Sequence, residues 1–206
     1  MRSWRKKVWV MLVLTGFWLP ALSADTSHLA VDTGGGTSGF RNVTVLIVRH
    51  AEKPKDGRGL SEQGLQRAEG YADYFETLRV DGSPLTPRRL IAATNSAGSE
   101  RSMLTLQPLS ERLGLPIEQD FGKRQVKDLV TSLKKDNTAP VVLIAWHHGH
   151  LDKLIDAFGG TSKKLHRCRS WPSDVYNWLV VLRFDEQGYL DESRSEVMQE
   201  HVLPGD

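Results

Sequence analysis

The chain has 206 residues, of which 39% are hydrophobic and 25% are charged. This length suits a single domain, and this composition excludes a disordered chain, a collagen-like fibre and a multi-span membrane protein. The single cysteine, Cys168, excludes an internal disulfide framework and a cysteine-based zinc site.

The formal net charge of +2 comes from the first 24 residues, which include four basic side chains and no acidic one. The rest of the chain has 23 basic and 25 acidic residues, a net charge of −2. Because no broad basic field remains, we expect no nucleic-acid partner.

Residues 1–24 have the order of a secretory signal peptide. A positive start is followed by an apolar stretch from Val8 to Leu19, then by Pro20 and small residues. The stretch is short for a bilayer span, which needs about 20 residues. We therefore expect cleavage after Ser23 or Ala24, a periplasmic or secreted protein, and no stable membrane association. The alternative is an uncleaved membrane anchor.

Residues 25–42 are rich in Gly, Ser and Thr and predict a mobile linker. Gly34, Gly36 and Gly39 match the spacing of a dinucleotide-binding motif, which must follow a strand and open a helix. Here the glycines precede the first predicted strand, so we attribute the spacing to chance. Residues 43–206 are then the folded domain.

Strands and helices alternate through this domain. Apolar runs predict strands at 43–48, 90–93, 141–146 and 178–184. Helical spacing predicts four helices: one from Ser61, one at 99–113, one around 126–133, and one at 151–158 that ends before Gly159-Gly160. The first helix should turn Leu65, Ala68, Ala72 and Phe75 inward. Pro108 should kink the second. The alternation indicates a layered α/β domain with a largely parallel sheet.

Two of the predicted strands are followed at once by histidine. Arg49-His50-Ala51-Glu52-Lys53 follows the first strand, and His147-His148-Gly149-His150 follows the strand at 141–146. Ligands of open α/β sheets bind outside the carboxyl ends of the strands. We therefore expect these two segments to form one site.

Arg101 lies in the first turn of the helix predicted at 99–113, where Ser96 or Ser99 can cap the backbone. An arginine at a helix N-terminus can bind an anion, although a surface pair with Glu100 or Asp120 is the alternative. Arginines and two histidines together suit a phosphoryl group, because a neutral imidazole can attack phosphorus and a second can stabilise its oxygens.

At these residues the sequence resembles the histidine phosphatase superfamily, the phosphoglycerate-mutase-like enzymes with an RHG or RHA signature. The resemblance rests on VLIVRHAEK at 45–53, on GLSEQG at 59–64, on Arg101 with Thr105, and on VLIAWHH at 142–148. It implies a three-layer α/β/α sandwich and a phosphomonoesterase that needs no metal and no other cofactor.

The resemblance also implies roles for individual residues. His50 is expected to be the nucleophile that forms a phosphohistidine, with Arg49 and Arg101 holding the phosphoryl oxygens. Strand alternation turns only one of His147 and His148 toward the phosphate. We choose His148, because members of the family that the sequence resembles place a varied residue between the tryptophan and the histidine. Lys53 and Glu52 are expected at the substrate, Glu52 orienting the pocket.

The general acid and the substrate stay open. Glu118, Asp120, Asp128 and Glu52 are all candidates for protonating the leaving group. The substrate is expected to be a phosphorylated small molecule of unspecified identity. Trp171 is expected at the rim of the cleft.

Other functions remain as alternatives. His148-Gly149-His150-Leu151-Asp152 matches the HxHxD opening of a metal-dependent hydrolase, although Lys153 stands where that motif continues with histidine. A catalytically weak protein that binds phosphorylated ligands is another. A mutase is disfavoured by the expected export. The oligomeric state cannot be predicted from the sequence.

Overall fold

A six-stranded sheet with the strand order β5-β4-β6-β1-β7-β8 forms the centre of the domain. The computed structural model describes residues 39–136 and 138–206, so the predicted signal peptide and most of the predicted linker lie outside the described residues. The strands are β1 (Thr44–Arg49), β2 (Arg79–Val80), β3 (Ser83–Pro84), β4 (Arg89–Ala92), β5 (Ile117–Glu118), β6 (Val141–Trp146), β7 (Trp178–Arg183) and β8 (Glu196–Gln199).

The sheet is mostly parallel, as the alternation of elements predicts. β5, β4, β6 and β1 pair in parallel, whereas β7 runs antiparallel to both β1 and β8. β2 and β3 form a separate two-stranded hairpin. The helices are α1 (Glu62–Thr77), α2 (Arg101–Leu113), α3 (Val126–Lys135), the short 3-10 helix η1 (His148–His150), α4 (Leu151–Ala157) and α5 (Ser162–His166).

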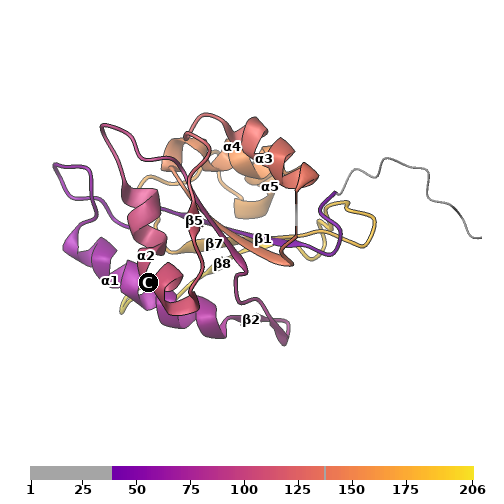
Figure 1. Ribbon diagram of the computed structural model, residues 1–206, viewed down its shortest axis with the longest axis horizontal. Coiled ribbons are helices and arrows are strands. Elements are labelled where there is room, and N and C mark those ends of the chain that lie inside the picture. Colours follow the sequence, from indigo (N-terminus) through magenta and orange to yellow (C-terminus); the bar gives the residue numbers. More distant parts are fainter. Residues whose placement is uncertain (1–38, 137) are drawn as a thin grey trace, which may run out of the picture. The chain divides into compact units, whose positions relative to one another are not determined.

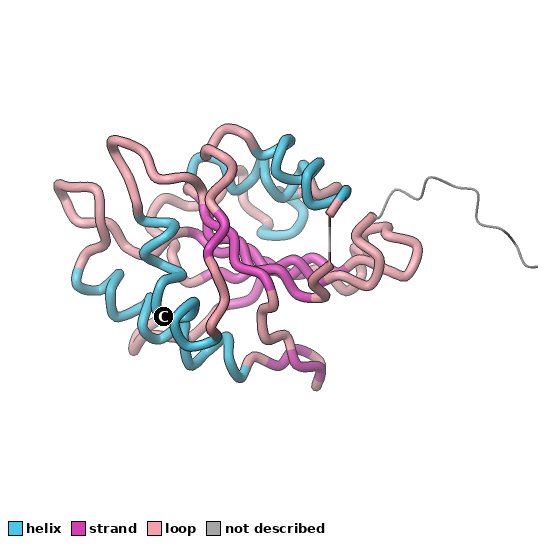
Figure 2. The backbone as a smooth tube through the Cα atoms, in the orientation of Figure 1, coloured by secondary structure: helices cyan, strands magenta, loops and turns pink. Residues whose placement is uncertain are grey.

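Helices cover both faces of the sheet (Figure 1; Figure 2), which confirms the predicted three-layer arrangement. α1 and α2 lie on one face, and α3, α4 and α5 lie on the other. The alternation of side chains along β1 explains this: Val45 and Ile47 pack with α3 and α4, whereas Leu46 and Val48 pack with α1 and α2. A strand that is buried on both faces needs apolar side chains at every position, which explains the continuous apolar run in the sequence.

The folded domain starts earlier than the sequence predicts. Phe40, placed in the predicted linker, is only 1% exposed and contacts the rings of Phe158 and Phe184. Burial of an aromatic ring stabilises this segment against the core. The last residues of the predicted linker are therefore part of the domain.

Two predictions about side-chain burial are wrong. Leu65, expected on the inner face of α1, is 53% exposed, and Arg67 and Tyr71 are buried on that helix instead. Trp171, expected at the rim of the cleft, is 2% exposed and packs against Trp178. No helix in the described ranges has the length and hydropathy that crossing a bilayer requires.

Candidate active site

The carboxyl ends of β1 and β6 bring the two histidine segments together. Arg49 pairs with Trp146 in the parallel ladder, and the backbone N–H of His50 donates to the Trp146 carbonyl at 2.9 Å. One residue further along each strand, the rings of His50 and His147 lie with their centroids 5.4 Å apart and their planes at 72°. The expectation that the two segments meet at one edge of the sheet is confirmed.

The surroundings of His50 select one ring nitrogen as a nucleophile. Its Nδ1 lies 2.8 Å from the carbonyl oxygen of Ala51, so Nδ1 carries the proton and Nε2 carries the free lone pair. Burial is the largest effect on His50 and, together with the charges of His147, Arg49 and Arg101, lowers its pKa to about 3. The hydrogen bond to the Ala51 carbonyl acts in the opposite direction and raises the pKa. The imidazole is therefore neutral at neutral pH and able to attack an electrophile.

His147, and not His148, faces His50. His148 begins η1, and its Nε2 lies 2.9 Å from the carbonyl oxygen of Trp171, so its ring is occupied by a loop contact. The prediction that one of the pair faces the site is right, but the choice of His148 does not match the geometry. Burial, followed by the charges of Lys123, Arg101 and His150, lowers the pKa of His147 to about 4.

Arg49 is 3% exposed and is held by the loop that precedes β7. Its Nη1 donates to the carbonyls of Ser173 and Val175 at 2.8 and 2.9 Å, and its guanidinium lies 3.5 Å from the ring centroid of Tyr176. Its Nε is buried without a hydrogen-bond partner among the described residues. A buried donor of this kind is costly unless a ligand satisfies it.

Arg101 is positioned by the loop between β1 and α1. Its Nε donates to the Gly59 carbonyl at 3.0 Å and its Nη2 to the Gly57 carbonyl at 2.6 Å. Its Nη1 donates to Ser99 Oγ, and neither Glu100 nor Asp120 forms an ion pair with it. The N-cap residue is Glu100, whose side chain makes no capping hydrogen bond, but Ser99 Oγ accepts from the Arg101 backbone N–H at 3.4 Å, so the predicted capping is confirmed in part for Ser99.

The segment after His50 is fixed by α1 and α2. The backbone N–H of Ala51 donates to Thr105 Oγ1 at 2.9 Å, and that hydroxyl donates to the Arg101 carbonyl. Ser61 caps α1 by accepting from the Gly64 N–H, and a Cβ on Gly64 would lie 2.3 Å from the Glu52 carbonyl oxygen. Only glycine allows this approach of α1 to the segment that follows His50.

Glu52 and Lys53 have different surroundings. Glu52 is buried and receives a two-pronged hydrogen bond from Arg67, which also binds Asp206 and lies near Glu200. Glu52 is therefore tied to α1, as expected of a residue that orients the pocket, while Lys53 is exposed. Burial raises the pKa of Glu200 to about 8, consistent with one arginine facing three carboxyl groups.

None of the four predicted general-acid candidates is free and close to the histidines. Glu118 is bound by Arg89 through two hydrogen bonds, and Glu52 is bound by Arg67. Asp128 accepts from Gln125, and Asp120 is exposed.

The HxHxD segment does not converge on a common point. His148 contacts the Trp171 carbonyl, whereas Asp152 Oδ1 lies 3.1 Å from His166 Nε2. Within residues 39–136 and 138–206, no three His, Cys, Asp or Glu side chains are grouped as metal ligands. The residues present do not fit the metal site that the motif suggests.

Sequence reasoning missed the basic loop between β5 and α3. Lys123 affects the pKa of His147, and its carbonyl accepts from Trp146 Nε1 at 3.1 Å. The sequence signal was the pair Lys123-Arg124 after a short strand, but β5 has only two residues and was not predicted.

The fold is found in known phosphatases. No protein-family model matches the sequence, and no curated protein matches it either. A proposed alpha-ribazole-5'-P phosphatase from Escherichia coli has a similar structure, with a TM-score of 0.53 and 12% sequence identity over 80% of this chain and 99% of that chain. The protein histidine phosphatase SixA complexed with tungstate matches with a TM-score of 0.50 and 16% identity, over 79% of this chain and 100% of that chain.

A mycobacterial glucosyl-3-phosphoglycerate phosphatase complexed with inorganic phosphate also matches, with a TM-score of 0.50 and 13% identity over 79% of this chain and 100% of that chain. At these identities the likeness concerns the fold. The chain therefore has the phosphoglycerate-mutase-like fold of the histidine phosphatases, as the sequence motifs predict.

Proposed function

We propose that this protein is a phosphomonoesterase that forms a phosphohistidine at His50, and that it belongs to the histidine phosphatase superfamily. The observation that carries the proposal is the neutral, Nδ1-anchored ring of His50 facing His147 at the carboxyl edge of the sheet. The surrounding charges of Arg49, Arg101 and Lys123 suit a dianionic phosphoryl group.

The reaction proceeds in two steps. In the first, the Nε2 lone pair of His50 attacks phosphorus, an N–P bond forms, and the P–O bond to the alcohol breaks. The alcohol oxygen leaves with the bonding pair and takes a proton from the solvent. In the second step, water attacks phosphorus and gives up a proton to the solvent, the N–P bond breaks with its electron pair returning to Nε2, and inorganic phosphate is released. The Ala51 carbonyl stabilises the positive charge that develops on the ring while the N–P bond exists.

Each neighbouring side chain supports this chemistry. The unpartnered Nε of Arg49 offers a hydrogen bond to a phosphoryl oxygen, and Arg101 offers its remaining guanidinium protons. His147, across from His50, stabilises the equatorial oxygens, because a bound dianion raises the pKa of an imidazole that faces it. We propose that no metal takes part, since these cationic side chains neutralise the phosphoryl group.

We further propose that the enzyme is exported and is a phosphatase of the histidine acid phosphatase type. The support for export is the order of charged, apolar and small residues in positions 1–24. The support for the acidic type is the low pKa of His50, which keeps the nucleophile neutral in mildly acidic solution. A phosphorylated small molecule is the proposed substrate class.

The test is a screen of the purified mature protein over a panel of phosphomonoesters, including 4-nitrophenyl phosphate. His50→Asn is the control, because the asparagine amide can still donate to the Ala51 carbonyl while offering no nucleophilic nitrogen. We expect turnover that survives exhaustive dialysis against EDTA and is lost in His50→Asn. Equal turnover by a folded His50→Asn protein would overturn the proposal, and loss on chelation with recovery on adding zinc would favour a metal hydrolase.

A further inference from the structure

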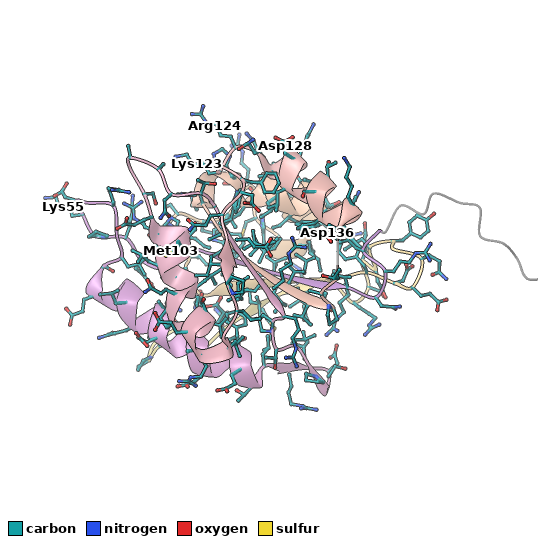
Figure 3. The ribbon with its side chains drawn as sticks, in the orientation of Figure 1. Lys55, Met103, Lys123, Arg124, Asp128 and Asp136 are labelled. Atoms are coloured by element: carbon teal, nitrogen blue, oxygen red, sulfur yellow. The ribbon has the colours of Figure 1, made fainter. Side chains whose placement is uncertain are left out.

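A basic wall extends the proposed phosphoryl site on one side. The loop at 119–125 supplies Lys123 and Arg124, which project from the segment before α3 (Figure 3). This loop is fixed in place, because the Thr94 N–H donates to the Phe121 carbonyl and Trp146 Nε1 donates to the Lys123 carbonyl. The wall therefore has a fixed backbone next to His147, which follows Trp146 directly.

Three cationic side chains, Lys123, Arg124 and Lys153, lie near enough to His150 to influence it. Burial lowers the pKa of His150, and the charges of Lys153, Lys123 and Arg124 lower it further. In the described part of the chain, none of these four side chains has a carboxylate within 4.0 Å. The nearby Asp152 is engaged with His166, and Asp128 accepts a hydrogen bond from Gln125.

Empty space lies beside these charges. A cavity of about 290 Å³ lies between residues 94–96 and residues 122–125. The side formed by residues 94–96 is joined to the proposed phosphoryl site by two hydrogen bonds: the Ser96 N–H donates to the Ser99 carbonyl, and Ser99 Oγ accepts from Arg101. The side formed by residues 122–125 includes Lys123, whose carbonyl accepts a hydrogen bond from Trp146, the residue before His147. The segments that line the cavity are thus tied by hydrogen bonds to Ser99, which contacts Arg101, on one side and to Trp146, which precedes His147, on the other.

Like charges gathered without partners raise the free energy of the empty site, and a second anion would relieve this repulsion. We infer that the natural substrate carries a further anionic group, a phosphate or a carboxylate, on its leaving group, and that Lys123 and Arg124 bind it with His150 alongside. This inference rests on the proposed phosphatase function and adds the substrate's charge pattern to it.

The test compares aryl phosphates in matched pairs. One member carries a carboxymethyl or phosphonomethyl group at the meta or para position of the ring, and the other carries a neutral carboxamidomethyl group. The methylene separates the charge from the leaving oxygen, so the two members have similar leaving groups. In the wild type we expect kcat/KM for the anionic member to exceed that for the neutral member by about tenfold or more.

The double variant Lys123→Gln/Arg124→Gln should bring this ratio close to one, because only the anionic member of each pair loses a partner; the ratio within a pair, and not the absolute turnover, is the readout. Lys163→Gln is the matched control, because Lys163 is exposed on α5, which lines a different cavity with β8. A wild-type ratio near one, or a ratio that the double variant leaves unchanged, would overturn the inference.

Failure of the proposed function gives a different result. If the wild type hydrolyses no member of the series, the same compounds are titrated by calorimetry into the wild type and the double variant. Tighter binding of the anionic members that depends on Lys123 and Arg124 would then support the second anion site alone. Equal dissociation constants within each pair would overturn it.

Discussion

The imidazole rings of His50 and His147 lie 5.4 Å apart at centroid, inclined by 72°, although 97 positions separate the two residues in the chain. The parallel pairing of β1 with β6 creates this proximity, because Arg49 and Trp146 are partners in register. Each histidine is the first residue beyond its strand. A phosphoryl group approaching this edge of the sheet would meet both rings.

The first prediction distinguishes the two neighbouring histidines. His147→Gln should lower kcat/KM for 4-nitrophenyl phosphate by about a hundredfold or more, because His147 faces His50 and would stabilise phosphoryl oxygens. His148→Gln should lower it by no more than about tenfold, since a glutamine amide can still donate to the Trp171 carbonyl. The reverse order of effects would restore His148, the residue that the sequence favoured.

The second prediction concerns the pH dependence of the rate. A histidine with an ordinary pKa would lose its nucleophilic form below about pH 6.5, whereas the pKa of His50 is lowered to about 3. We therefore expect kcat/KM to be highest on the acidic side of neutral, because His50 stays neutral there, and to fall in alkaline solution, where His147 facing a bound dianion loses its proton. The measurement is kcat/KM from acidic to alkaline solution, corrected for the ionisation of the substrate. A steady rise into alkaline solution would contradict the two-histidine arrangement.

The third prediction is the effect of pH on stability. Because the pKa of His50 is lower in the folded state, the unfolded chain binds more protons between pH 6.5 and 3, and the free energy of unfolding falls as the pH drops through this interval. His50 alone should remove about 2 kcal/mol of stability between about pH 8 and pH 5. Urea unfolding at both pH values should show a smaller loss in His50→Asn than in the wild type. Equal losses would mean that His50 is not buried in its neutral form.

The fourth prediction concerns the buried guanidinium of Arg67, which links α1 to Glu52 in the segment after β1. Arg67→Met should destabilise the fold by about 3 kcal/mol, because it leaves buried Glu52 without its partner. Arg112→Met is the control, since the exposed pairs of Arg112 with Asp73 and Glu76 should leave stability unchanged within error. Chemical denaturation of both variants provides the comparison, and an equal loss in the two would show that burial adds nothing at Arg67.

The sequence predicted the central strands, α1 and the meeting of the two histidine segments at one edge of the sheet, because long buried strands and a capped helix leave local patterns. It missed β8, because an edge strand of four residues with two apolar side chains has no distinct pattern. The β2–β3 hairpin was also missed, although Asp81-Gly82, both with positive φ, is a known hairpin signal.

The sequence indicated which segments form the candidate site but not the geometry of that site. Strand-end position and residue type marked His50, Arg49 and Arg101. The choice between His147 and His148 depends on where β6 ends and η1 begins, which is a tertiary feature. The link from Lys123 to the site runs through a hydrogen bond to Trp146, a contact between residues 23 positions apart. Pairings of this kind leave no local signal in one sequence.

The central claim is that the reaction passes through a phosphohistidine at His50. The most direct measurement is rapid quenching of the enzyme in alkali during turnover of an aryl phosphate labelled with radioactive phosphorus, followed by mapping of the labelled peptide. We predict a label that is stable in alkali, is lost in acid, and lies on the peptide containing His50, with none in His50→Asn. An unlabelled protein that still turns over substrate at every quench time, or a label on any other residue, would contradict the account.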